Sequence, residues 1–521
     1  MGRGSDKGLP AFRGSLAAGI FGISLACFIA SCGGGGGGGD VVAAVAPAPA
    51  FASSNLIVTR TIYAGTASTV AVGQVLPGGS GRAAVADGSF PNVFKNVAPD
   101  PSFGVSSPVF LDQRKSDGSL VGTTAIDPSL ITSSFSSKSE LALNVSTDGS
   151  SVTFMGYKAA IDQLDVSTSN TPAVVDSTNP VSATFQRAVA EFGLTDGSLK
   201  VIGVNAYSGS QGRAVILANG NYYMVGNSGN GSGAGDVLSA LNDNTGVQLI
   251  SAGNPGVGNT TAVGVALGTY GDAAGYQRGF SLAQLPDPAN PGKNYAPDKT
   301  GKDANFRGLT IFNDTVYVSK GSGSNGVNSV YQVGAARALA NGGNLSNAVI
   351  AILPGLNTLS QKVAETKTTL TATAHPFGIW FADANTLFVA DEGDGISLGV
   401  AGKVSTFAGL AQYKLINGAW NQVAIYQTGL LDQPAYKASL PWNVKADGLR
   451  NIAGKVNADG SMTIYATTST VSDELTHDQG ADPNQLVSIT VKSGSTAANA
   501  SFTVLLTAAA GERLGGVAIA P

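Results

Sequence analysis

GIWFADANTLFVADEGDG, residues 378–395, is the stretch that decides the fold class. Its apolar residues form two short runs, 379–381 and 387–390, with the polar segment Asp383–Asn385 between them. Asp and Asn tolerate the left-handed backbone conformation that a tight turn requires, so this pattern predicts a β-hairpin. The polar, Gly-containing run that follows the second strand is typical of a loop.

The layout of this stretch recurs along the chain as an apolar strand, a polar turn, a second strand and a Gly-rich loop. Further copies begin at Glu140, Arg213, Gly308 and Asn451, and a weaker one begins near Thr261. Repeats of this length are typical of architectures in which each copy buries its apolar faces against its neighbours. The abundance of Gly, 70 residues in all, suits a β protein with many tight turns.

The two ends of the chain each carry half a copy. Residues 516–521 (GVAIAP) match the first strand of the pattern, and residues 55–65 (NLIVTRTIYAG) match the second. Pairing the two halves would close a ring and remove exposed sheet edges. The sequence therefore predicts an all-β fold, a single β-propeller of about seven four-stranded blades, within a range of about six to eight. Pairing of the N- and C-terminal strands is expected to close it.

The copy at residues 378–395 resembles the blades of secreted bacterial propellers of the NHL and YVTN types. In those blades a Gly and two apolar residues precede an Asp/Asn turn and an aromatic–Val–Ala–Asp run. The blocks FSSKSELALNVSTDG (135–149) and NAYSGSQGRAVILANGNYYMVGNS (205–228) also resemble an uncharacterised group of hypothetical bacterial lipoproteins. These resemblances imply the propeller fold and no particular activity.

The first residues of the chain are typical of an export signal. Residues 1–14 carry three basic side chains against one acid, and residues 15–31 form an uncharged run too short for a stable transmembrane span. The run ends in IASC at residues 29–32, which resembles a bacterial lipobox. The resemblance implies cleavage before Cys32 and lipid on its sulfur. The alternative is an ordinary signal peptide with an incidental cysteine.

We therefore expect three parts: a signal peptide over 1–31, a lipidated Cys32 with a Gly/Ala/Pro-rich tether over 32–53, and the propeller over 54–521. Because residue 33 is Gly and not Asp, the lipobox resemblance favours an outer-membrane lipoprotein facing the periplasm or the cell surface. The formal net charge of −4 argues against a nucleic-acid partner, which would require basic patches.

Charged residues stand at or just before several first strands. Glu140 begins one copy, Arg213 begins another and Arg307 directly precedes a third, with Arg450 placed similarly. In a propeller the first strand lines the central channel, so these side chains are candidate contacts for a ligand. Arginines there could hold an anion through paired hydrogen bonds. The alternative is that each arginine pairs with an acid of a neighbouring blade.

Acidic residues gather in two stretches. One is Asp391, Glu392 and Asp394, and the other, which also holds His477, is the candidate metal site at Asp473, Glu474, Asp478 and Asp482. Carboxylates on loops are ligands for hard cations, so Ca²⁺ is the cofactor to consider at the second group. The alternative is a set of solvated loop acids.

Three further sequence patterns could mark a functional site, and each also has a purely structural explanation. Ser397 lies in a G-x-S-x-G run, but the residues after it are strand-like where a serine hydrolase requires a helix. The G-x-G-x-x-G run at 321–326 also precedes a strand, so a β-turn is expected and not a dinucleotide loop. The tryptophans Trp380, Trp420 and Trp442 either pack between blades or form a surface for stacking sugars or peptides.

Two function classes remain. The first is a membrane-anchored binding or scaffold module with an envelope protein, peptide or glycan as its partner. The second is a metal-dependent hydrolase or lactonase of the propeller type, which would use channel-facing acids on a divalent ion. Acids at equivalent first-strand positions would favour the second class, and only Glu140 is so placed. We therefore favour the binding module and assign no catalytic residue.

Overall fold

The computed structural model describes residues 51–521, except for 77–82, 92–103, 136, 138–139, 230–240, 242, 254–257, 259, 264, 267–275, 278, 297–302, 322–325, 343–344, 346–347, 361–373, 396–404, 473–480 and 493. The expected signal peptide, Cys32 and nearly all of the tether therefore lie outside the described residues. Within the described ranges, no helix has the length and apolar character needed to cross a membrane.

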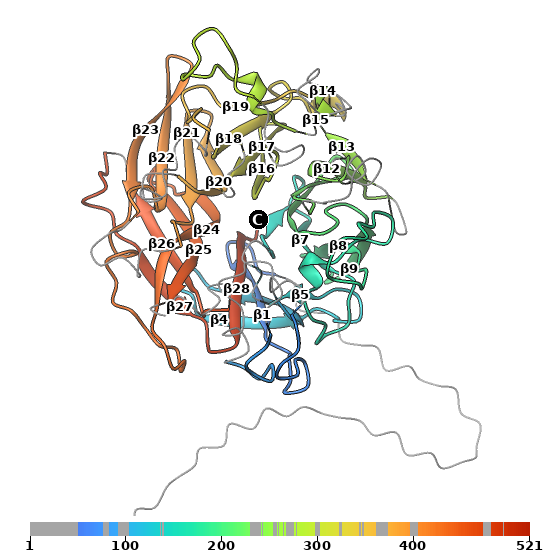
Figure 1. Ribbon diagram of the computed structural model, residues 1–521. Helices are drawn as coiled ribbons and strands as arrows, with labels where there is room; N and C mark the ends of the chain where they lie inside the picture. Colours follow the sequence, from blue (N-terminus) through green and yellow to red (C-terminus); the bar gives the residue numbers. More distant parts are fainter. Residues whose placement is uncertain are drawn as a thin grey trace, which may run out of the picture. The chain divides into compact units, whose positions relative to one another are not determined.

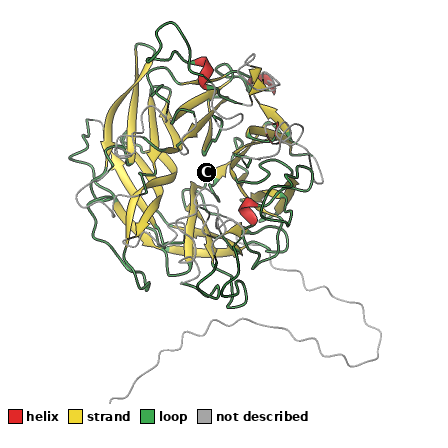
Figure 2. Ribbon diagram, viewed as in Figure 1, coloured by secondary structure: helices red, strands yellow, loops and turns green. Residues whose placement is uncertain are grey.

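Six four-stranded antiparallel sheets form the blades, and Figures 1 and 2 show them arranged around one centre. From first to fourth strand they are blade 1, β28 (Glu512–Ile519), β1 (Leu56–Ile62), β3 (Val109–Arg114) and β4 (Leu120–Ala125); blade 2, β6 (Asn144–Val145), β7 (Ser151–Tyr157), β8 (Arg187–Gly193) and β9 (Leu199–Val204); blade 3, β10 (Gly212–Ala218), β11 (Asn221–Gly226), β12 (Gly246–Ser251) and β13 (Thr261–Val263); blade 4, β16 (Gly308–Phe312), β17 (Thr315–Lys320), β18 (Ser329–Val333) and β19 (Ile350–Ile352); blade 5, β20 (Pro376–Asp383), β21 (Thr386–Asp391), β22 (Gly409–Ile416) and β23 (Ala419–Tyr426); and blade 6, β24 (Val444–Val456), β25 (Met462–Ser472), β26 (Gln485–Val491) and β27 (Thr503–Thr507).

Smaller elements complete the described structure. They are a two-stranded sheet of β2 (Ser106–Ser107) and β5 (Ser133–Ser134), a second of β14 (Val265–Ala266) and β15 (Tyr276–Gln277), and the 3-10 helices η2 (Val166–Thr168), η3 (Leu282–Gln284) and η4 (Ala340–Gly342). The all-β fold class is therefore confirmed.

The predicted ring closure is also confirmed. β28 pairs antiparallel with β1, so that Leu56 lies opposite Ile519 and Ile62 lies opposite Glu512. Figure 1 shows β28 and β1 side by side in this blade. The first strands contact one another in the cycle β6, β10, β16, β20, β24, β28 and back to β6. The ring is thus continuous only because the last strand of the chain is the first strand of blade 1.

The described residues form six blades, the lower end of the expected range, and the difference from seven arises at one copy. The segment near Thr261 is β13, which pairs with β12 as the fourth strand of blade 3. A separate blade at this position would place a new first strand between β10 and β16, but these two strands contact each other directly. The other copies do form the first two strands of a blade, which gives six blades within the described residues.

The core lies between the blades. Apolar clusters fill all six interfaces between neighbouring blades, because strands that are buried on both faces send alternate side chains to either side. In β1, Leu56 and Val58 pack toward blade 6, and Ile57 packs toward blade 2. Each blade therefore depends on both neighbours for burial of its apolar side chains.

The hairpin turns use the residue types that the sequence pattern indicates. In blade 5, Asp383 accepts hydrogen bonds from the Asn385 N–H at 2.7 Å and from the Thr386 hydroxyl at 2.9 Å. In blade 2, the Asp148 carboxylate accepts from the backbone N–H of Ser150 at 3.0 Å and from its hydroxyl at 2.7 Å. These short-range bonds fix the turns that place the first and second strands of a blade side by side.

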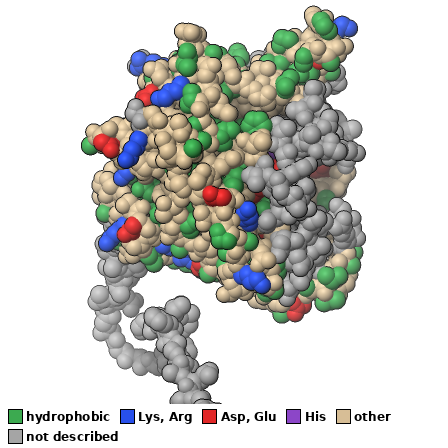
Figure 3. All heavy atoms as spheres, turned by 90° about the vertical axis from the view of Figure 1, so that its left-hand side faces the viewer, with side chains coloured by type: hydrophobic (Ala, Val, Ile, Leu, Met, Phe, Trp, Pro, Cys, Tyr) green, Lys and Arg blue, Asp and Glu red, His purple; other side chains and the backbone are tan. Residues whose placement is uncertain are grey.

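Charged side chains are sparse on the surface. On the side that Figure 3 draws, they stand singly or in small groups among apolar and neutral polar residues. This agrees with a chain in which only 12% of residues are charged.

Candidate functional site

Four charged side chains from four blades form what we call the central charged cluster: Arg213, Arg307, Glu392 and Arg450. Arg307 Nη1 lies 3.0 Å from Glu392 Oε1, and Arg450 Nε lies 3.2 Å from Glu392 Oε2. The three side chains are 11%, 12% and 7% exposed for Arg307, Glu392 and Arg450 respectively. One carboxylate of blade 5 therefore joins blades 4 and 6.

Arg213 completes the cluster from blade 3 without an acid partner in hydrogen-bond contact. Its Nη1 donates to the Phe306 carbonyl oxygen at 2.9 Å and to the Asn305 side-chain oxygen. Burial and then repulsion by Arg307 lower the pKa of Arg213, Glu392 partly offsets both, and the net pKa is about 9. The guanidinium is thus held in place by neutral oxygens and lies within the field of a second arginine.

A group of acids borders the cluster on the side of blades 5 and 6. The Asp391 carboxylate accepts the backbone N–H of His375 and, at 3.0 Å, that of Gly393. The Asp447 carboxylate accepts the Gly395 N–H at 2.8 Å. Burial is the main cause that raises the pKa of Asp391 to about 7 and that of Asp447 to about 7. Burial also lowers the pKa of His375.

Glu140 occupies a comparable position at blade 2, where it is buried. Its carboxylate accepts the Tyr157 hydroxyl and, at 3.0 Å, the Ser134 N–H. Burial raises the pKa of Glu140 to about 7, against the lowering effect of these hydrogen bonds. The guanidinium carbon of Arg187 lies 5.3 Å from the centre of the Tyr157 ring. Blade 2 therefore adds a second group of buried ionisable side chains.

The candidate channel contacts Arg213 and Arg307 are thus brought together, and Glu140 lies apart in blade 2. Arg307 pairs with an acid of the neighbouring blade, which is the alternative to ligand binding that the sequence left open. Arg213 instead contacts a backbone carbonyl and a side-chain amide. Sequence reasoning missed that Glu392 links two arginines, and it missed Asp447 altogether. The Ala–Asp–Glu run at the end of a second strand was the available signal for Glu392.

The predicted calcium group falls mostly outside the described residues. Asp473, Glu474 and Asp478 lie there, as do His477 and Ser397. Asp482 is described, and its carboxylate accepts the Trp442 indole N–H at 2.9 Å and the Ser472 hydroxyl. In the described part of the chain, no group of three or more His, Cys, Asp or Glu side chains could hold a metal ion.

The three tryptophans lie in or beside the apolar interfaces. Trp420 and Trp442 are buried, and Trp380 stacks on Phe388 with ring centroids 5.6 Å apart. Their packing uses much of the surface that a stacking platform for a ligand would present.

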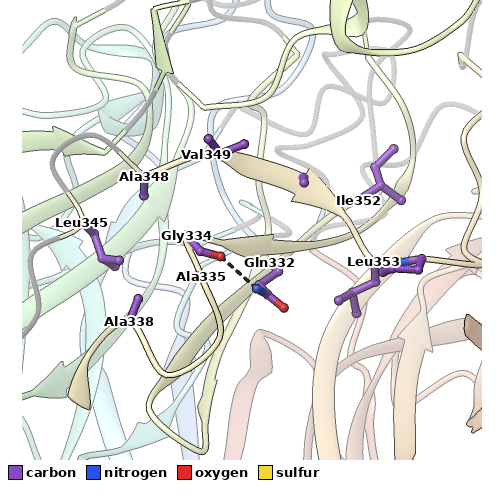
Figure 4. A pocket seen from close by; sticks show the side chains of 11 residues that line it. Gln332, Gly334, Ala335, Ala338, Leu345, Ala348, Val349, Ile352 and Leu353 are labelled. Atoms are coloured by element: carbon purple, nitrogen blue, oxygen red, sulfur yellow. Dashed lines mark hydrogen bonds between the residues drawn. The ribbon is translucent and has the colours of Figure 1, made fainter. Parts of the chain in front are cut away.

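A pocket of about 780 Å³ lies at the outer strands of blade 4. Figure 4 shows Ala338, Leu345 and Ala348 on one side of it and Ile352 and Leu353 on the other. The Gln332 amide is turned to the Gly334 carbonyl oxygen at 2.8 Å, and no charged side chain lines the pocket. Its lining offers apolar contact and little that would select one ligand.

Comparisons with known proteins add little to this description. No family model matches the sequence, and no curated protein does. Among solved structures, the chain is similar to a Bacteroides fragilis protein provisionally described as a 6-phosphogluconolactonase, with 11% identity, a TM-score of 0.34 and coverage of 89% of this chain and 97% of that one. It is also similar to the polysaccharide lyase Uly1, with 11% identity, a TM-score of 0.32 and coverage of 70% and 71%. The N-terminal domain of Nup159 gives 10% identity, a TM-score of 0.25 and coverage of 90% and 97%.

Proposed function

We propose that the protein is an exported, lipid-anchored β-propeller that binds a ligand at the end of the ring where the central charged cluster lies. The support for export and anchoring is the lipobox-like run at residues 29–32, followed by a Gly-rich tether. The support for binding is the cluster itself. The ligand is a component of the cell envelope, such as a peptide, a glycan or another protein.

The observation that carries the binding proposal is that four blades send charged side chains to one place. Burying charge opposes folding unless the charges are well paired, and well-packed apolar residues can replace a buried ion pair without loss of stability. Three arginines gather here around one carboxylate, which is bonded to two of them, while the third, Arg213, donates to Asn305 and Phe306. Such an arrangement is typical of a ligand site, where charge serves recognition.

The hydrolase alternative lacks a comparable observation. A divalent ion requires several convergent side chains, and the described residues contain no group of His, Cys, Asp or Glu that could hold one. The buried acids Asp391 and Asp447 instead accept backbone N–H groups. We therefore propose no reaction.

The test of anchoring is metabolic labelling with palmitate. The wild-type protein incorporates the label and fractionates with membranes, whereas a Cys32→Ser variant does neither. Label in the Cys32→Ser protein would contradict the lipid anchor.

The test of binding is a screen of the full chain, purified in detergent, against envelope glycans, peptidoglycan fragments and peptides. A ligand whose binding is weakened by Arg450→Gln and not by Arg337→Gln supports the proposal. Arg337 serves as the control because its side chain is 65% exposed and pairs with Asp314, outside the central charged cluster. Ligands that bind both variants equally well would contradict it.

A further inference from the structure

We propose that Arg213 is the anion-binding residue of this site, taking a carboxylate or phosphate group of the ligand on its Nε and Nη2 edge. This inference rests on the proposed binding function and names the chemistry that the ligand must carry. It follows from a comparison of Arg213 with Arg187, a buried arginine of blade 2.

Arg187 shows how a structural arginine is satisfied in this protein. It is fully buried, and all three of its guanidinium nitrogens donate to carbonyl or hydroxyl oxygens, including the Ser210 carbonyl at 2.9 Å from Nε and the Ser169 carbonyl at 2.7 Å from Nη2. A guanidinium bonded on every side has no capacity left for a ligand. Arg187 therefore supports blade 2 and nothing more.

Arg213 is buried to nearly the same degree but is bonded differently. Its exposed fraction is 4%, and among the described residues only Nη1 finds hydrogen-bond acceptors. Nε is buried without a hydrogen-bond partner, and Nη2 makes no hydrogen bond to any described residue. A buried, unbonded donor is costly, and in native proteins it marks a site for water, an ion or a ligand.

The edge formed by Nε and Nη2 is the one that binds a carboxylate elsewhere in this chain. Arg60 donates from Nε to Asp112 Oδ2 at 3.0 Å and from Nη2 to Asp112 Oδ1 at 3.2 Å. Two parallel N–H groups match two oxygens of a carboxylate or phosphate, which gives both geometry and strength. Arg213 presents the same edge without an acid of the described residues upon it.

The surroundings of Arg213 also favour an anion. Arg307 repels it, and Glu392, the acid that partly offsets this repulsion, is itself shared by Arg307 and Arg450. The neighbouring acids Asp391 and Asp447 accept backbone N–H groups and form no ion pair with Arg213. An oxyanion on Arg213 would offset the repulsion between two arginines within a low-dielectric site.

Carboxylate and phosphate share this recognition chemistry, so the experiment has two arms. Binding of inorganic phosphate and of citrate to the purified full chain is measured by isothermal titration and by thermal shift. We expect saturable binding of at least one probe. Arg213→Lys keeps the positive charge and loses the two-donor edge, and it is expected to weaken that binding at least about tenfold, the effect of losing one charge-assisted hydrogen bond.

Arg337→Gln is the control, because it removes an exposed arginine and should leave binding unchanged. Circular dichroism of Arg213→Lys shows whether the variant is folded, and if it is not, competition of phosphate with citrate on the wild type tests for one shared site. Absence of saturable binding by the wild type, or equal binding by the folded lysine variant, would overturn the inference. If the envelope ligand still depended on Arg450 in that case, the proposed binding function would stand without it.

Discussion

Glu392 and Arg450 form an ion pair across the interface of blades 5 and 6, with Arg450 Nε 3.2 Å from Glu392 Oε2. The same carboxylate holds Arg307 of blade 4 through its other oxygen, at 3.0 Å. Both arginines and the acid are largely buried. Three successive blades are therefore fastened by one side chain, and the stability of the ring should depend on it.

We predict that Glu392→Gln lowers the free energy of unfolding by about 2–4 kcal/mol, because it leaves two buried arginines without their acid. Asp314→Asn is the matched control, since the Asp314–Arg337 pair is exposed and 3.8 Å apart. Loss of this exposed ion pair should lower the free energy of unfolding by less than about 1 kcal/mol. Urea denaturation measures both variants, and equal costs for the two would show that Glu392 does not fasten the blades.

Ring closure predicts a large effect from a small truncation. Deleting residues 512–521 removes β28, including the buried Leu514 and Val517, and leaves β1 with β3 as its one remaining partner and with an exposed edge. We expect a loss of several kcal/mol, at roughly 1.5–3 kcal/mol for each large apolar side chain, or aggregation through the exposed edge. Deleting the exposed Pro521 alone is the control. A truncated protein that melts within a degree or two of the parent would contradict the closure.

Close packing at the first strand of blade 4 can be tested with a glycine. A Cβ on Gly308 would lie 1.8 Å from the Phe377 carbonyl oxygen, whereas a Cβ on Gly122 would meet nothing within 4 Å. Gly308→Ala is expected to cost about 1–3 kcal/mol because the first strands of blades 4 and 5 must move apart. Gly122→Ala should change stability little. Thermal denaturation compares them, and similar melting temperatures would rule out the close approach.

The raised pKa values predict that stability falls as pH rises. Asp447 has a pKa of about 7 in the folded protein, against an ordinary value of 3.8. Between these values the unfolded chain loses its proton first, so the folded state loses stability as pH rises from about 4 to about 7. The pKa values of Asp391 and Glu140 are also raised to about 7, so Asp447→Asn should remove only the share of the fall in melting temperature that Asp447 contributes over this window.

Asp148 provides the opposite case as a control. Hydrogen bonds from Ser146 and Ser150 lower the pKa of its carboxyl. Its contribution is therefore present above its unfolded pKa and is lost as pH falls through the folded value. Asp148→Asn should lower the stability of the protein at neutral pH. It should leave unchanged the fall in melting temperature between about pH 4 and 7. The same profile for both variants would contradict a contribution of Asp447 to the fall.

The hairpins and the ring closure could be predicted because both depend on local signals. Alternating apolar residues identified the first two strands of blades such as blade 5, and Asp383 and Asn385 marked its turn. The number of blades could not be predicted in the same way, because a short apolar run does not indicate which strand it will pair with. Thr261–Val263 has the composition of a first strand and pairs instead as a fourth.

The candidate site was predictable only in part, for a similar reason. Arg213 and Arg307 could be placed at the start of first strands from the repeat alone. Their partners could not, since Glu392 is separated from Arg307 by 85 residues and from Arg450 by 58. Whether an arginine meets an acid or a carbonyl depends on how neighbouring blades are rotated against each other, which periodicity does not record.

The central claim is that the charged end of the ring is a binding site, and a crystal soaked in selenate tests it most directly. Selenate carries the oxyanion chemistry of phosphate, and its selenium is located by anomalous scattering. We predict an anomalous peak within hydrogen-bond reach of the Nε and Nη2 atoms of Arg213. Peaks confined to exposed lysines and arginines, with none at Arg213 in crystals that leave this end accessible to solvent, would contradict the account.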